Sequence, residues 1–180
     1  MEENRGNLAF RPLTEPDLEY MLKWLTDERV LEFYEGRDFQ CDMESLREKY
    51  LERESAPGFM IELNGEPIGY SQMYPVRGEL FAEYDYPETD ENVYAMDQFI
   101  GVPELWGKGI GTQYLRMALG YLKNEKAAEV VLLDPHENNT RAVRAYEKAG
   151  FRIQKKLPAH EAFEGTMADC LLMEYRFDTH

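Results

Sequence analysis

The stretch Trp106-Gly107-Lys108-Gly109-Ile110-Gly111-Thr112 is the most informative part of this chain, because it joins a predicted strand to a predicted helix. The strand is the apolar run 93–102, and the helix covers about 112–123. Glycines let the backbone approach a ligand closely, and the N–H groups at a helix N-terminus bind anions. The stretch is not a Walker A loop, because it lacks the Gly-Lys-Ser/Thr that ends such a loop. A tight turn that binds nothing is the alternative at this point.

After this turn the sequence alternates between predicted strands and predicted helices. The apolar run 130–133 is a short strand that ends at Asp134-Pro135. A helix over 140–149 ends at Gly150, a residue suited to the left-handed position after a helix. Strands over 151–155 and 170–177 close the chain. The connections 102–130 and 134–151 are long enough to cross over as helices.

Before the turn, the strongest local signal is Asn64-Gly65, which predicts a β-hairpin over 59–74. A strand over 8–13 precedes a helix over 15–25, for which Thr14 is the candidate N-cap. The other predicted segments are helices over 30–34 and 43–52 and a loop or irregular strand over 80–91. The order β-α-α-β-β-β-α-β-α-β-β predicts an α/β fold in one domain, residues 1–180, with a mixed central sheet flanked by helices.

A second motif lies in the segment 134–151. The pattern Asn-x-x-Ala-x-x-x-Tyr-x-x-x-Gly-Phe is met, with one position of slack near the asparagine, by Asn138, Ala142, Tyr146, Gly150 and Phe151. About 30 residues earlier, Gly109 and Gly111 match the glycines of Gln/Arg-x-x-Gly-x-Gly/Ala, although Trp106 replaces the Gln or Arg. The pair of motifs resembles the acyl-CoA-binding motifs of the Gcn5-related N-acetyltransferase (GNAT) superfamily. The resemblance implies the GNAT fold, acetyl-CoA as the donor and coenzyme A as a product.

Within this superfamily the whole chain resembles the aminoglycoside 6′-N-acetyltransferases. The segments that carry this likeness are 21–25, 31–34, 67–70, 96–101 and 133–135. The acetyltransferase half of the bifunctional aminoglycoside-modifying enzyme of Gram-positive cocci is the most similar of them. The resemblance implies acetyl transfer to the 6′-amine of antibiotics such as kanamycin.

Two residues are predicted to be catalytic. Asp97 lies on the strand before the glycine stretch, and the resemblance gives it the role of the general base. A carboxylate there can take the proton of a substrate ammonium, directly or through water, or can only hold that ammonium. Tyr146 has the position of the superfamily's general acid, which protonates the leaving thiolate; a helical tyrosine that only packs in the core is the alternative.

Two further sets of residues are assigned to the ligands. The predicted cofactor-binding residues are Gln98, Phe99, Ile100, Gly107, Lys108, Gly109, Ile110, Gly111, Thr112, Asn138 and Asn139. Either asparagine could equally be a helix cap. The predicted substrate-binding residues are Tyr34, Gln72, Tyr74, Glu79, Asp97, Asp134 and Asp169. No metal is assigned, because His136 and His160 lack ligand-type spacing.

The charge of the chain bears on its partners. Its 35 Asp and Glu residues exceed its 20 Lys and Arg residues, which gives a net charge of −15. Nucleic acid and anionic membranes are therefore poor partners. The negative electrostatic field of the protein would instead attract a small polycation such as an aminoglycoside. A solvated acidic surface that only maintains solubility is the alternative.

The remaining features concern location and the other possible functions. Two widely separated cysteines, Cys41 and Cys170, give no disulfide framework, which favours the cytoplasm. Nothing in the sequence fixes the oligomeric state. Competing functions are acetylation of a protein N-terminus or a polyamine, and a silent acyl-CoA-binding module or acidic nucleic-acid mimic.

Overall fold

The computed structural model describes residues 6–178. Its strands are β1 (Leu8–Pro12), β2 (Gly58–Leu63), β3 (Glu66–Pro75), β4 (Val93–Ile100), β5 (Val130–Leu133), β6 (Arg152–Phe163) and β7 (Thr166–Arg176). Its α-helices are α1 (Leu18–Trp24), α2 (Glu28–Leu31), α3 (Met43–Leu46), α4 (Glu79–Glu83), α5 (Ile110–Lys126) and α6 (Thr140–Ala149). Among these residues the strands hydrogen-bond in the order β1-β2-β3-β4-β5-β7-β6. The pair β4/β5 is parallel and the pair β5/β7 is antiparallel, so the predicted mixed sheet is confirmed.

The chain divides into two compact units. Unit 1 runs to Met73 and includes Asp97–Tyr114, whereas unit 2 is Tyr74–Met96 together with the chain from Leu115 onward. The strands β3 and β4 and the helix α5 each contribute residues to both units. The single domain expected from the sequence stays a prediction.

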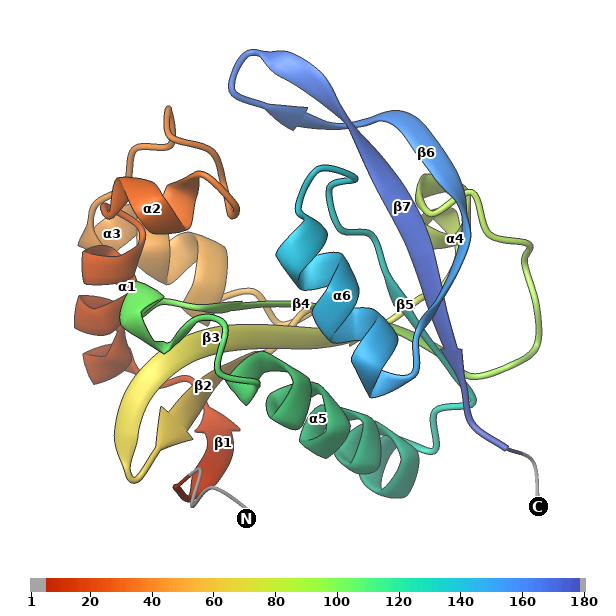
Figure 1. Ribbon diagram of the computed structural model, residues 1–180, viewed down its shortest axis with the longest axis horizontal. Helices are drawn as coiled ribbons and strands as arrows, with labels where there is room; N and C mark the ends of the chain where they lie inside the picture. Colours follow the sequence, from red (N-terminus) through yellow and green to blue (C-terminus); the bar gives the residue numbers. More distant parts are fainter. Residues whose placement is uncertain (1–5, 179–180) are drawn as a thin grey trace. The chain divides into compact units, whose positions relative to one another are not determined.

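Unit 1 combines the β1-β2-β3 strands with the helices α1, α2 and α3 (Figure 1). Thr14 and Asp17 form a capping box at the start of a short 3₁₀ turn, Glu15–Asp17, that leads into α1. The predicted helix over 15–25 and its N-cap are thereby confirmed. Leu18, Met21 and Leu25 are fully buried on one face of this helix, as their helical spacing requires.

The predicted hairpin of unit 1 is also confirmed. Asn64 and Gly65 connect β2 to β3 with φ values of 53° and 81°, the left-handed pair of a type I′ turn. Farther along β3, a Cβ on Gly69 would lie 2.4 Å from the carbonyl oxygen of Phe99. A glycine is required there because it lets the backbone of β3 approach the end of β4.

Unit 2 contains the parallel pair β4/β5 and a long β6/β7 hairpin, drawn in blue in Figure 1. Its buried core includes Val93, Val130, Leu132 and Leu172. The β6/β7 turn is Glu164-Gly165, with both residues at positive φ. The predicted strands 151–155 and 170–177 are therefore too short on the side that faces this turn. The turn was missed because Glu-Gly is a weaker turn signal than Asn-Gly.

Four other expectations need correction. Residues 79–83 form the short helix α4 rather than a loop or strand. The predicted helix 30–34 lies earlier, as α2, because Asp27 caps it by accepting a hydrogen bond from the Arg29 amide. The helix predicted at 112–123 is longer at both ends, and the one predicted at 43–52 changes from α3 to a π-helical segment at Arg47–Leu51.

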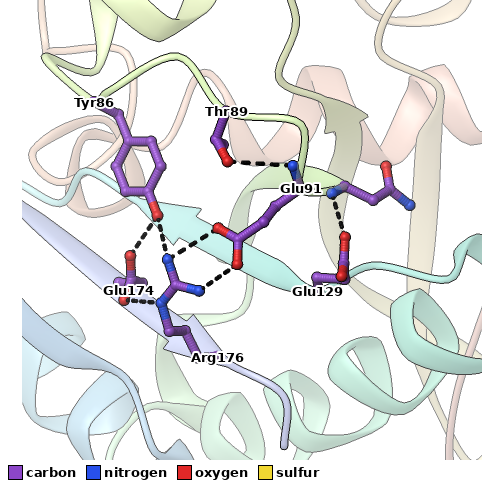
Figure 2. A network of polar contacts seen from close by, with 7 residues as sticks. Tyr86, Thr89, Glu91, Glu129, Glu174 and Arg176 are labelled. Carbon is purple, nitrogen blue, oxygen red and sulfur yellow. Dashed lines mark hydrogen bonds and ion pairs between the residues drawn. The ribbon is translucent and has the colours of Figure 1, made fainter. Parts of the chain in front are cut away.

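A polar network holds the segment after α4 against β7 in unit 2 (Figure 2). Arg176 makes two hydrogen bonds to the carboxylate of Glu91, at 2.7 and 3.1 Å, and a third to Glu174 at 3.0 Å. The hydroxyl of Tyr86 donates to Glu174 at 2.6 Å. The pKa of Tyr86 is raised to about 12, first because the side chain is partly buried and second because it is hydrogen-bonded to Glu174.

Candidate active site

Asp97 lies in unit 1, at the point where β4 passes beside β3. The side-chain amide of Gln72 on β3 donates a hydrogen bond of 2.7 Å to one carboxylate oxygen of Asp97. The carbonyl of the same amide accepts a bond of 3.2 Å from the hydroxyl of Tyr70, which is fully buried. The amide orients the Asp97 carboxylate and, being neutral, does not itself cancel the charge of that carboxylate.

Three aromatic side chains pack together in the same part of unit 1 as this carboxylate. Residues 97 and 99 share one face of β4, and the ring of Phe99 lies 4.4 Å from that of Tyr34 and 5.9 Å from that of Tyr70. Burial, followed by nearby charges that include Asp97, raises the pKa of Tyr34 well above its usual value. Unit 1 therefore brings together three predicted substrate-binding residues, Tyr34, Gln72 and Asp97.

The glycine stretch forms an open turn at the start of α5. Gly107 and Gly109 have φ values of 74° and 80°, conformations that favour glycine. A Cβ built on Gly107 or Gly111 meets no atom within 4 Å, so the backbone there borders open space. Because the helix begins at Ile110, its first N–H groups lack intrahelical partners, and this arrangement suits a phosphate.

The side chains of this stretch serve different purposes. Ile110 and Thr112 are buried, so only their backbone groups are candidates for contact with a ligand, whereas Lys108 is exposed. The indole of Trp106 donates to the carbonyl of Ile100 at 2.8 Å and packs edge-on against Phe33. The tryptophan that replaces the family's Gln or Arg therefore fastens the loop to the end of β4.

The second motif forms α6 in unit 2. The side chain of Asn139 caps this helix by accepting a hydrogen bond of 3.3 Å from the amide of Ala142. The capping alternative thus holds for Asn139, while Asn138 is exposed. Tyr146 is half-buried, with its ring 6.2 Å from that of Phe151. Gly150 ends the helix at φ 107°, as the sequence predicts.

Asp134, just after β5, is paired with a histidine, and burial raises the pKa of the Asp134 carboxyl group. Its carboxylate lies 2.9 Å from Nε2 of His160, a residue of β6 that sequence reasoning did not assign to the site. The hydrogen bond to Asp134 raises the pKa of His160 and favours the imidazolium form. A substrate ammonium that binds Asp134 must therefore compete with His160.

The other predicted residues of unit 2 have varied surroundings. Asp169 accepts a hydrogen bond of 2.8 Å from the amide of Ala159 and lies 3.1 Å from Nζ of Lys156. The amide, followed by the lysine, lowers the pKa of Asp169. Tyr74 shares a hydroxyl–hydroxyl hydrogen bond with Tyr84, and Glu79 is exposed at the first turn of α4.

Two arrangements escaped the sequence reasoning. The partner of Asp134 is 26 positions away, and the cluster His136, Glu161 and Cys170 spans a turn and two strands. Neither has a local spacing, because both arrangements depend on how the segment after β5 and the strands β6 and β7 pair. An open hollow of about 660 Å³ in unit 2 is lined by Glu91 and Arg176 among others, and its lining includes none of the predicted site residues.

Comparisons with known proteins identify the family to which this chain is similar. Residues 14–158 match the family described as the acetyltransferase (GNAT) domain. The aminoglycoside N(6′)-acetyltransferase type 1 of Klebsiella pneumoniae is 34% identical over 155 residues, which cover 84% of this chain and 77% of that protein. The spermidine N(1)-acetyltransferase of Escherichia coli is 24% identical over 159 residues, covering 87% of this chain and 78% of that protein.

A solved structure is similar over almost the whole chain. The crystal structure of the aminoglycoside acetyltransferase AAC(6′)-Ib with coenzyme A and kanamycin has a TM-score of 0.77 and 30% sequence identity. The match covers 94% of this chain and 95% of that one. Among the described residues, no helix is both long and apolar enough to cross a membrane.

Proposed function

The chain belongs to the GNAT acetyltransferase family, and on that premise we propose that it transfers the acetyl group of acetyl-CoA to the 6′-amine of aminoglycosides. The observation that carries this function is the likeness to aminoglycoside 6′-N-acetyltransferases, at 34% identity in sequence and over 94% of the chain in structure. Coenzyme A and the acetylated antibiotic are the products. The net charge of −15 supports a polycationic acceptor.

The turn before α5 is proposed to hold the phosphates of the donor. Backbone N–H groups within Gly107–Thr112 supply the hydrogen bonds, and the open space over Gly107 and Gly111 supports this role, since a side chain there would occupy it. Lys108 adds an exposed positive charge. The segment Gln98–Ile100 offers backbone groups to the pantetheine arm, and a backbone N–H there can support the developing oxyanion.

Asp97 is proposed to be the general base. It accepts a proton from the substrate ammonium, directly or through water, and Gln72 keeps the receiving oxygen in place. The neutral amine then attacks the carbonyl carbon of the thioester; a C–N bond forms and the C–S bond breaks. Tyr146 donates its phenolic proton to the departing thiolate. The acylated nitrogen gives up its second proton through solvent, which restores the Tyr146 phenol, and the proton held by Asp97 returns to solvent.

The proposed acceptor contacts are acidic and aromatic residues. Aromatic faces suit sugar rings and ammonium groups, and carboxylates pair with the ammonium groups. The proposed residues are Tyr34, Gln72, Tyr74, Glu79, Asp97, Asp134 and Asp169. Asp134 and Asp169 act there only if the substrate displaces their present partners, His160 and Lys156.

The proposal also covers the location of the protein and its kinship within the family. Neither Cys41 nor Cys170 is in a disulfide, which supports action in the reducing cytoplasm. The segments 21–25, 31–34, 67–70, 96–101 and 133–135 support a particular kinship with the acetyltransferase half of the bifunctional enzyme of Gram-positive cocci.

Thiol release from acetyl-CoA tests the proposed acceptor. The protein is supplied in parallel with kanamycin, spermidine and a basic peptide at equal concentrations. The proposal expects the highest kcat/KM for kanamycin. A preference for spermidine would instead support a polyamine acetyltransferase, the second function, which the likeness to the Escherichia coli enzyme favours. No release with any acceptor, together with tight acetyl-CoA binding, would indicate a silent binding module.

A further inference from the structure

Three donor side chains of different chemistry converge in unit 2. They are His136, three residues after β5, Glu161 in β6 and Cys170 in β7. A ring nitrogen, a carboxylate oxygen and the thiol sulfur all lie within 4.8 Å of one another. The imidazole and carboxylate already touch, with 2.7 Å between Nε2 of His136 and an oxygen of Glu161.

The backbone explains why His136 faces Cys170. The amide of Leu171 donates to the carbonyl of Pro135 at 2.9 Å, and that of Glu137 donates to the carbonyl of Asp169 at 3.0 Å. These two bonds flank an antiparallel bridge between residues 136 and 170. A pair flanked in this way is the narrow kind, in which the side chains approach most closely.

A bulge in β6 brings the third donor. Leu157 pairs with Cys170 and Glu161 pairs with Ala168, so three residues of β6 lie between partners that are separated by only one residue of β7. Ala159, inside the bulge, has a φ of 47°. Because residues 168 and 170 share one face of β7, the bulge returns Glu161 to the face that carries the thiol.

The donors match a borderline-soft divalent cation. Imidazole, thiolate and carboxylate are all zinc ligands, and three protein ligands leave the fourth tetrahedral position open to water. A glutamate and a thiolate would together balance the two positive charges of the ion. Ligand atoms around tetrahedral zinc lie roughly 3–4 Å apart, so the cluster needs only a small contraction.

The surroundings restrict the donors. Cys170 is fully buried, while the Glu161 side chain is 55% exposed, which gives the cation a route from solvent. The ring of Phe163 packs edge-on against that of His136, with centroids 4.6 Å apart, and limits the rotation of the imidazole.

We propose that His136, Glu161 and Cys170 form a binding site for Zn²⁺. The bound ion would link the 134–137 segment to the β6/β7 hairpin.

This site runs against the expectation from sequence that no metal binds. The donors are separated by 25 and 9 positions, which is no recognisable ligand spacing. They meet only because the bridge and the bulge bring three segments together. The inference is independent of the acetyl-transfer proposal, since it uses none of the residues proposed to bind or catalyse.

Titration of the chelator-treated protein with Zn²⁺ tests the site. Calorimetry should give one equivalent bound per chain, and Cys170→Ala or Glu161→Gln should weaken that binding by more than about 100-fold. Cys41→Ala and Glu66→Gln are the matched controls, because they remove a thiol and an exposed carboxylate in unit 1 and should bind as the parent does.

Co²⁺ provides a reading that does not depend on a folded variant. The parent protein loaded with Co²⁺ should show a thiolate-to-cobalt charge-transfer band, which Cys41→Ala retains and Cys170→Ala loses. Absence of the band in the parent, or equal Zn²⁺ affinity in the parent and Glu161→Gln, would overturn the proposal.

Discussion

Each unit of the molecule holds a network that includes a tyrosine and a carboxylate. The two networks differ in the chemical group that donates a hydrogen bond to the last carboxylate. In unit 1, Tyr70 and Gln72 lead to Asp97, which accepts a hydrogen bond from the neutral amide of Gln72. In unit 2, Tyr86 and Glu174 lead to Arg176, whose guanidinium holds Glu91 through two hydrogen bonds. An amide orients a carboxylate and leaves its charge, whereas a guanidinium neutralises it.

This difference separates a carboxylate suited to chemistry from one suited to structure. The arginine lowers the pKa of Glu91 and ties the segment after α4 to β7 (Figure 2). The Asp97 carboxylate has a fixed direction and can still receive a proton or an ammonium group. Under the proposed mechanism, Asp97 takes the proton of the substrate amine, and Glu91 has no part in the reaction.

The largest expected effect comes from Asp97→Asn, which keeps the shape of the side chain and removes its charge. We expect kcat/KM for kanamycin to fall by roughly 10²–10⁴, because the base that takes the amine proton is lost. The loss should be steepest below pH 7, where most of the amine is protonated. A pH–rate profile that overlays the parent's would contradict both roles of Asp97.

A smaller effect is expected from Gln72→Leu, which removes the amide while keeping a similar volume. One hydrogen bond to a charged group contributes about 1.5–3 kcal/mol, so kcat/KM should fall by roughly 10–100-fold. Urea denaturation of the same variant separates positioning from folding. A loss of activity that merely follows a loss of stability would mean that Gln72 does not orient the base.

The sequence predicted the features of both units that depend on local signals. Asn64-Gly65 and Gly150 each impose a backbone conformation on their own neighbours, so their turn and helix end were read correctly. Asp97 and Gln72 were both named as site residues, yet their contact was not foreseen, because it needs the register of β3 against β4. Strand pairing is non-local, and a single sequence does not display it.

The unit 2 network was missed for the same reason. Arg176 and Glu91 are 85 positions apart, and the segment 80–91, which contains Glu91, was predicted only as a loop or irregular strand. The helix α4 was missed because five residues make too short a pattern to identify. Prediction therefore succeeded for most helices and strands, and failed for contacts between side chains that are far apart in the sequence.

The unit 2 network should affect stability rather than activity. Arg176→Gln leaves Glu91 without its guanidinium and, for this largely exposed pair, should cost about 0.5–1 kcal/mol at pH 7 with unchanged kcat. The folded pKa of Glu91 is lowered, so its contribution is present above about pH 4.3 and is lost as the pH falls through that lowered value.

Urea denaturation at pH 7 and near pH 3 checks this expectation. The difference between parent and Arg176→Gln should be largest at pH 7 and should shrink at the lower pH. A difference of equal size at both values would mean that the guanidinium acts by packing alone, and the contrast between the two networks would lose its electrostatic basis.

The smallest effect is expected at Asp134, whose carboxylate already pairs with His160. Raising the salt should increase KM for kanamycin several-fold, since the Debye length shrinks from about 30 Å at 0.01 M to about 3 Å at 1 M. In Asp134→Asn this dependence should be flatter, because one charge facing the antibiotic is gone. The measurement is KM for kanamycin across a series of salt concentrations in the parent and in Asp134→Asn. An equal dependence of KM on salt in the two proteins would exclude Asp134 from the acceptor site.

The central claim is that this chain acetylates one particular amine of an aminoglycoside. The most direct measurement is the structure of the product formed from kanamycin and acetyl-CoA, by mass spectrometry and nuclear magnetic resonance. We predict a single added acetyl group, attached to the 6′-nitrogen, with one coenzyme A released for each molecule converted. An acetyl group on any other amine, or no modified kanamycin while spermidine is acetylated, would contradict this assignment.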